Sequence, residues 1–278
     1  MRTYYLILLK MKKFGMTILL LGWAFIGAAE EVSTQISIDL IQHYTRTIAS
    51  MPPHEFWSEV PDGLRDFDGV QFDCRGILEL TGMAGFESNN LRPAHISGVP
   101  IMQRCDVLHL LLCTTWNEEP GTVIGRMILN YAEGGSESIY FAQETHAQSF
   151  WGSGSLSGRG SGSTSPNSKR VWTKNSDRSS SIQLSLNRVA FANPRPDVLI
   201  ESIDFETCFS QSMPVILGLT LEKGKELLAS VLANKQKERL KPVDANYGGK
   251  IRIKLLRINH PFPRPKPSLL PVERRFNS

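Results

Sequence analysis

The chain has 278 residues, and 41% of them are hydrophobic, which is enough apolar material for a packed core. Its formal net charge of +4 is spread unevenly, because residues 30–222 carry 13 basic and 23 acidic side chains whereas residues 223–278 carry 14 and 4. Phosphate binding needs local positive charge, so the acidic body is not expected to bind nucleic acid. The sequence also lacks the Cys and His spacing of zinc sites and the common motifs of serine hydrolases, metalloproteases and phosphate-loop proteins.

The first 29 residues have the composition of an export signal. Four basic side chains precede an uncharged stretch over residues 14–29, which ends in the small residues Gly27, Ala28 and Ala29. The alternative is a transmembrane anchor, but a spanning helix normally needs about 18 or more apolar residues. We therefore predict that residues 1–29 are a signal peptide and that the mature protein is periplasmic or extracellular. Membrane contact is expected only through an uncleaved signal or through the basic C-terminal tail.

Segments with strand patterns recur along residues 30–222. Apolar side chains alternate with polar ones, or fill the segment, over residues 36–40, 71–80, 107–113, 124–131, 138–143, 182–186, 198–205 and 215–221. The run from Glu133 to Ser136 separates two of these segments and has the composition of a hairpin turn with positive φ. Residues 152–168, rich in glycine and serine, are predicted to form a mobile surface loop inside the domain. The sequence thus predicts an all-β fold, an antiparallel β-sandwich of the jelly-roll kind.

The composition changes after residue 222. Residues 225–240 are rich in helix formers and are followed by Pro242, which would end a helix. Residues 250–258 have a strand pattern, and residues 260–271 are rich in proline. We therefore predict a small basic α/β extension over residues 223–278 that ends in a proline-rich tail.

Four cysteines remain in the mature chain, namely Cys74, Cys105, Cys113 and Cys208. After export they could pair as disulfides, with three possible connectivities. Their neighbours are apolar and strand-like, so buried free thiols are an equally good interpretation. The sequence leaves both interpretations open.

A further set of segments between residues 36 and 222 is informative, namely residues 67–82, 98–100, 107–117, 124–135, 150–151, 171–172, 189–196 and 212–222. These segments resemble a galactose-binding-like jelly-roll domain that recurs in exported, mostly uncharacterised proteins of Verrucomicrobia-like and Planctomycete-like bacteria. The resemblance implies the β-sandwich fold and a non-catalytic accessory or sensory role, without naming a ligand.

Aromatic and polar side chains near the predicted loop ends suit a carbohydrate site. The apolar face of a pyranose stacks on flat aromatic rings, and its hydroxyls need polar partners. The candidates for stacking are Trp116, Trp151 and Tyr131, and the candidate polar partners are Asn117, Glu118, Glu119 and Arg126. The alternative is that these aromatics only cover the ends of the core.

Acidic residues around a predicted turn suggest a structural calcium ion. Asp66, Asp68 and Asp73 could supply oxygen ligands, although the complete calcium-loop pattern is absent and a solvated acidic turn is the alternative. No other cofactor is expected. His109 lies in the most apolar predicted strand and is expected to be a core histidine bonded to the backbone, rather than a catalytic base.

Taken together, these features predict an exported, non-catalytic β-sandwich module that binds a carbohydrate or an envelope protein. One alternative is a secreted glycan hydrolase that uses paired carboxylates, whose separation a sequence does not give. The other is a structural envelope scaffold in which the basic tail docks on an acidic surface.

Overall fold

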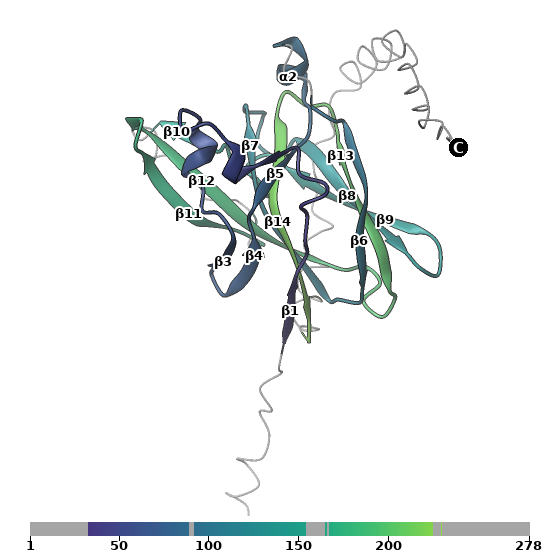
Figure 1. Cartoon of the computed structure of the whole chain (residues 1–278). Helices are drawn as coiled ribbons and strands as arrows, with labels where there is room; N and C mark the ends of the chain where they lie inside the picture. The colour runs from purple at the N-terminus through teal and green to yellow at the C-terminus, as the bar shows by residue number, and fades with distance from the viewer. Residues whose placement is uncertain (1–32, 89–91, 154–164, 166, 225–228, 230–278) are drawn as a thin grey trace, which may run out of the picture. The chain divides into compact units, whose positions relative to one another are not determined.

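The computed structural model describes residues 33–88, 92–153, 165, 167–224 and 229 (Figure 1). The chain divides into residues 1–34 and residues 35–278, and the sheets described below belong to the second unit except for Thr34, the first residue of β1. The predicted signal peptide, almost all of the predicted C-terminal extension, and residues 154–164 and 166 of the predicted loop lie outside the described residues. Among the described residues, no helix is long and apolar enough to cross a membrane.

The larger sheet has eight strands. Its central path runs β10–β12–β7–β14–β5–β2, while β1 pairs with β14 and β11 pairs with β12. The strands are β1 (Thr34–Ser37), β2 (Arg46–Thr47), β5 (Gly76–Glu79), β7 (Val107–Thr115), β10 (Trp151–Ser153), β11 (Ser168–Ser176), β12 (Ser179–Ala192) and β14 (Met213–Lys223). The pairs along the path are antiparallel.

The smaller sheet has four antiparallel strands in the order β6–β13–β8–β9. They are β6 (His95–Gln103), β8 (Val123–Tyr131), β9 (Ser136–Ala142) and β13 (Ile200–Thr207). The predicted hairpin is confirmed: β8 and β9 pair directly, and Gly134 and Gly135 take φ values of 89° and 82° in the turn. Together the two sheets confirm the predicted antiparallel β-sandwich.

The main core lies between the two sheets, and β7 shows how the sequence builds it. Every residue of β7 is buried. Its side chains alternate between faces: Leu108, Leu110 and Leu112 join the core between the sheets, whereas Leu111 and Cys113 join a second apolar cluster. Strand β7 has apolar side chains on both of its faces and is covered on both, as we predicted for residues 107–113.

The second apolar cluster covers the other face of the larger sheet. Its cover consists of a two-stranded hairpin, β3 (Leu64–Phe67) and β4 (Val70–Asp73), and two short 3-10 helices, η1 (Ile48–Ser50) and η2 (Phe56–Glu59). Trp57 and Phe72 pack here with Leu217 of β14. The cover lies so close that a Cβ on Gly218 would be 2.9 Å from a ring carbon of Phe72. The short helix α2 (Met83–Glu87) follows β5.

All four cysteines are free thiols in the structure, and their burial raises the pKa of each thiol. Cys74, Cys105 and Cys113 are buried, and Cys208 is half-buried. Burial is the largest cause of a raised pKa at each: to about 12 for Cys74 and Cys105, to about 11 for Cys208, and well above the usual value for Cys113.

We expect the native thiols to react slowly with iodoacetamide. The thiolate is the nucleophile, and a raised pKa keeps a thiol protonated until the pH rises through that raised value. At about pH 8, mass spectrometry should find Cys208 alkylated first, and the other three should be alkylated at a comparable rate only after unfolding. Rapid alkylation of Cys74, Cys105 or Cys113 in the folded protein would contradict the buried positions described here.

Candidate functional site

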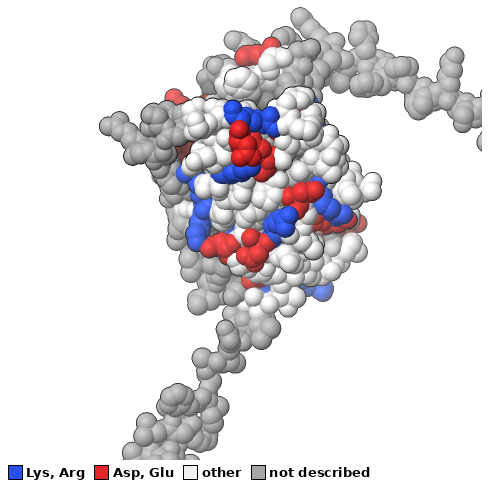
Figure 2. Space-filling view, turned by 60° about the vertical axis from the view of Figure 1, so that its left-hand side comes forward, with Lys and Arg blue, Asp and Glu red and all other residues white. Residues whose placement is uncertain are grey.

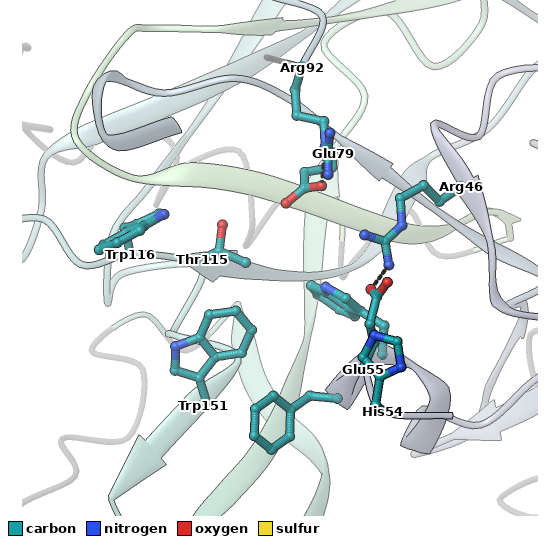
Figure 3. A pocket seen from close by; sticks show the side chains of 10 residues that line it. Arg46, His54, Glu55, Glu79, Arg92, Thr115, Trp116 and Trp151 are labelled. Carbon is teal, nitrogen blue, oxygen red and sulfur yellow. Dashed lines mark hydrogen bonds and ion pairs between the residues drawn. The ribbon is translucent and has the colours of Figure 1, made fainter. Parts of the chain in front are cut away.

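A pocket with a volume of about 350 Å³ lies where β5 and β7 end (Figure 3). Glu79 is the last residue of β5 and Thr115 is the last residue of β7. Strand β14 lies between β5 and β7 and aligns their ends. Val215 pairs with both Glu79 and Cys113, and Met213 pairs with Thr115. The described residues that line it are Arg46, His54, Glu55, Phe56, Trp57, Glu79, Arg92, Thr115, Trp116 and Trp151.

Trp151 presents a half-exposed indole to the pocket and is held by other aromatic rings. It is 38% exposed, and its ring centroid lies 5.5 Å from Phe150, 6.1 Å from Phe56 and 6.4 Å from Trp57. Trp57 and Phe150 in turn stack at 3.9 Å with nearly parallel planes. These contacts orient the indole before a ligand arrives, which lowers the entropic cost of binding.

Trp116 stands at the pocket in an unusual backbone conformation. It is 51% exposed and has a φ of +66°, in the left-handed region that bulky residues rarely occupy. The Ser212 hydroxyl donates a hydrogen bond to the Trp116 carbonyl at 3.3 Å, and the Gln211 amide donates to a Glu118 carboxylate oxygen at 2.8 Å. Such strain costs about 1–3 kcal/mol and persists where the surroundings impose it, often at binding sites.

The polar groups of the pocket include two deeply buried side chains. Glu79 is 3% exposed, and one of its carboxylate oxygens accepts a hydrogen bond from Arg92 Nε at 2.5 Å. Thr115 is 4% exposed, and its Oγ1 makes no hydrogen bond within the described part of the chain. In Figure 3 the Thr115 hydroxyl points to the side where Glu79 and Trp116 lie, and its oxygen has almost no solvent-accessible surface. A buried hydroxyl without a partner is costly to the folded protein.

An ion pair lines the other side of the pocket. Arg46 of β2 bonds to Glu55, which precedes η2, and His54 lies beside them (Figure 3). With Arg92 and Glu79, the pocket holds two guanidinium groups and two carboxylates, which are paired with one another. The charges of these four described side chains therefore sum to zero. Flat aromatic faces above paired, directional polar groups suit a ligand that combines an apolar face with many hydroxyls.

The structure brings two of the sequence-predicted residues together in this pocket and places the others elsewhere. Trp116 and Trp151 both line it. Tyr131 is buried in the core between the sheets and donates its phenolic O–H to Asn193 at 2.6 Å. Arg126 is paired with Glu206 on the smaller sheet.

The loop after β7 holds the remaining polar candidates. Asn117 and Glu119 are exposed and do not line the pocket, and Glu118 accepts the backbone hydrogen bond already described. Sequence reasoning missed the polar lining, namely Arg46, Glu55, Glu79, Arg92 and Thr115. One signal was available, since Glu79 is a charged residue in an otherwise apolar strand.

The three predicted calcium ligands each have other partners. Asp66 accepts the Gly69 amide at 3.0 Å, and Asp73 is bonded to Arg75. Asp68 is bonded to Lys169 and Arg188, and these hydrogen bonds lower its pKa. Within the described ranges, no group of three or more His, Cys, Asp or Glu side chains is arranged to hold a metal ion.

His109 is buried, as expected, but its partner is a side chain and not the backbone. Its Nε2 lies 2.9 Å from a carboxylate oxygen of Glu222, and its Nδ1 lies 3.5 Å from Arg188. Arg188 Nη2 in turn donates a hydrogen bond to Asp68 Oδ2 at 2.7 Å. The expected backbone bond is wrong because β7 and β14 are paired here: Thr220 lies opposite His109, and the next residue on the same face of β14 is Glu222.

The strain at Trp116 predicts a difference between two variants. Trp116→Ala and Trp116→Gly remove the same indole, but only glycine relaxes at positive φ. We expect the glycine variant to unfold with a free energy about 1 kcal/mol higher than that of the alanine variant, measured by urea denaturation. Equal stabilities, or a less stable glycine variant, would show that the left-handed conformation is not strained.

Comparisons with known proteins add no family to these observations. No protein-family model matches the chain, and no curated protein matches it significantly.

Proposed function

We propose that this protein is an exported, non-catalytic β-sandwich module that binds a carbohydrate in the pocket lined by Trp116 and Trp151. One observation carries the proposal: two half-exposed tryptophans from different elements converge on a pocket whose lining also includes two arginine–glutamate pairs. A volume of about 350 Å³ falls within the range of small-molecule sites, about 300–1,000 Å³.

Other partner classes find less support on the described surface. The large exposed hydrophobic residues outside the pocket are Ile36, Ile41, Leu64, Met102 and Tyr140, which belong to several different segments of the chain. On the face shown in Figure 2, basic and acidic side chains lie next to one another, and phosphate backbones favour a continuous basic surface. The scaffold alternative depends on residues 223–278, nearly all of which lie outside the described residues.

A glycan hydrolase is the second candidate, because Glu55 and Glu79 line the same pocket. Glycosidases use two acidic side chains, one of which must carry a proton in the resting enzyme. Here Glu55 is ion-paired with Arg46 and Glu79 with Arg92, so each acidic group already has a basic partner within the protein. This arrangement favours binding over hydrolysis.

Isothermal titration calorimetry of the full chain against neutral and acidic oligosaccharides tests the proposal. We expect saturable heat with at least one saccharide and no release of new reducing ends on prolonged incubation. Release of reducing ends that is lost in Glu79→Gln would support the hydrolase. The absence of heat with every saccharide would overturn the proposed function.

A further inference from the structure

The charged groups of the pocket are arranged in pairs, and this bears on which saccharides it accepts. Arg92 Nε donates to Glu79, and Arg46 is ion-paired with Glu55. Recognition of an anionic sugar normally uses a guanidinium that binds the sugar carboxylate through two parallel hydrogen bonds. Both guanidinium groups lining this pocket already bond to a carboxylate of the protein, so a uronate would have to compete with Glu55 or Glu79.

Glu79 is the acidic group that most affects an entering ligand. Its side chain is buried, and Figure 3 shows its carboxylate directed toward the space beside Thr115 and Trp116. Arg92 balances the Glu79 carboxylate, so a second anion placed beside it would have no positive partner of its own, and burial leaves the repulsion poorly screened by solvent and salt. A sugar hydroxyl, in contrast, can donate a hydrogen bond to Glu79.

We propose that the pocket selects neutral saccharides over saccharides that contain uronic acids, and that Glu79 is the residue that determines this selectivity. The inference rests on the proposed carbohydrate function. Trp116 and Trp151 stack on the sugar whatever its charge, since stacking depends on the apolar face of the ring. The buried carboxylate of Glu79 then accepts hydroxyl groups and repels acidic ones.

The test compares the wild type with Glu79→Gln in calorimetric titrations. The probes are neutral hexose tetrasaccharides and tetragalacturonate. We expect the wild type to prefer a neutral tetrasaccharide by about tenfold or more. In Glu79→Gln this preference should shrink about tenfold or reverse, because the glutamine keeps the shape while the positive charge of Arg92 is no longer balanced by Glu79.

Glu206→Gln is the matched control, because it removes a carboxylate from an arginine pair on the smaller sheet, outside the pocket lining. Its preference should equal that of the wild type. If Glu79→Gln does not fold, judged by its thermal unfolding, the comparison of neutral tetrasaccharides with tetragalacturonate in the wild type still tests the selectivity.

The outcomes separate this inference from the proposed function. A wild type that binds tetragalacturonate as tightly as neutral saccharides overturns the selectivity and leaves carbohydrate binding intact. An unchanged preference in Glu79→Gln overturns the role of Glu79. Binding of neither class overturns the proposed function itself.

Discussion

Replacing Trp151 with alanine is expected to weaken saccharide binding by about tenfold or more, which corresponds to about 1.4 kcal/mol or more. The indole supplies one of the two half-exposed aromatic surfaces of the pocket, and the rings of Phe56, Trp57 and Phe150 hold it in place. The indole surface is already in place before a saccharide binds, so we expect no other side chain of the variant to replace it. Calorimetric titration with the saccharide that binds the wild type most tightly measures the effect.

Tyr140→Ala is the control for this prediction. Tyr140 is another exposed aromatic residue, 42% exposed on β9, and it does not line the pocket. Its replacement should leave the dissociation constant unchanged. Equal losses in Trp151→Ala and Tyr140→Ala, or full affinity in Trp151→Ala, would place the binding site elsewhere.

Removing the imidazole of His109 is expected to lower the free energy of unfolding by about 3 kcal/mol. His109 is 1% exposed and Glu222 is 4% exposed, and their side chains meet at 2.9 Å on the face of the larger sheet that the β3–β4 hairpin covers. Replacing His109 with leucine removes the imidazole from the buried Glu222 carboxylate, which still accepts a hydrogen bond from Gln35 at 3.3 Å, and losing one close partner of a buried charge is strongly destabilising. Urea denaturation monitored by circular dichroism gives the free energies.

The double variant His109→Leu with Glu222→Leu distinguishes this cause from loss of packing. It removes both polar groups together, so we expect it to be more stable than His109→Leu alone, because no carboxylate then remains buried without the imidazole. Additive losses in the two single variants and the double variant would contradict a direct coupling between the two side chains.

The sequence predicted the strands well where hydrophobic periodicity was strong. The fully apolar β7, the β8–β9 hairpin and β14 were expected at nearly their observed positions. Strand β6 was not predicted because it contains Pro100, which interrupts a strand pattern but is tolerated in an edge strand. The cover formed by η1 and η2 was missed because proline-rich residues 50–63 have no periodicity, and only tertiary packing shows that Trp57 is part of the core.

The candidate site was partly predictable. Trp116 and Trp151 follow predicted strand ends, so an aromatic role was expected for both, but their convergence depends on packing between distant segments. The same reasoning assigned Tyr131 and Arg126 to one site, although alternation along β8 puts them on opposite faces. Met127, Leu129 and Tyr131 share the inward parity, and Arg126 has the outward one. The buried Glu79 and Thr115 become significant only when β14 brings the ends of β5 and β7 to nearly the same level.

The most direct test of the account follows the indole N–H signals of the five tryptophans by NMR while a saccharide is added. The account predicts that the signals of Trp116 and Trp151 shift most and with the same saturation curve, that Trp57 shifts less because it contacts Trp151, and that Trp172 on β11 does not shift. Shifts confined to Trp172, or unchanged signals at Trp116 and Trp151 under conditions where the sugar is bound, would contradict the claim that this pocket is the carbohydrate site.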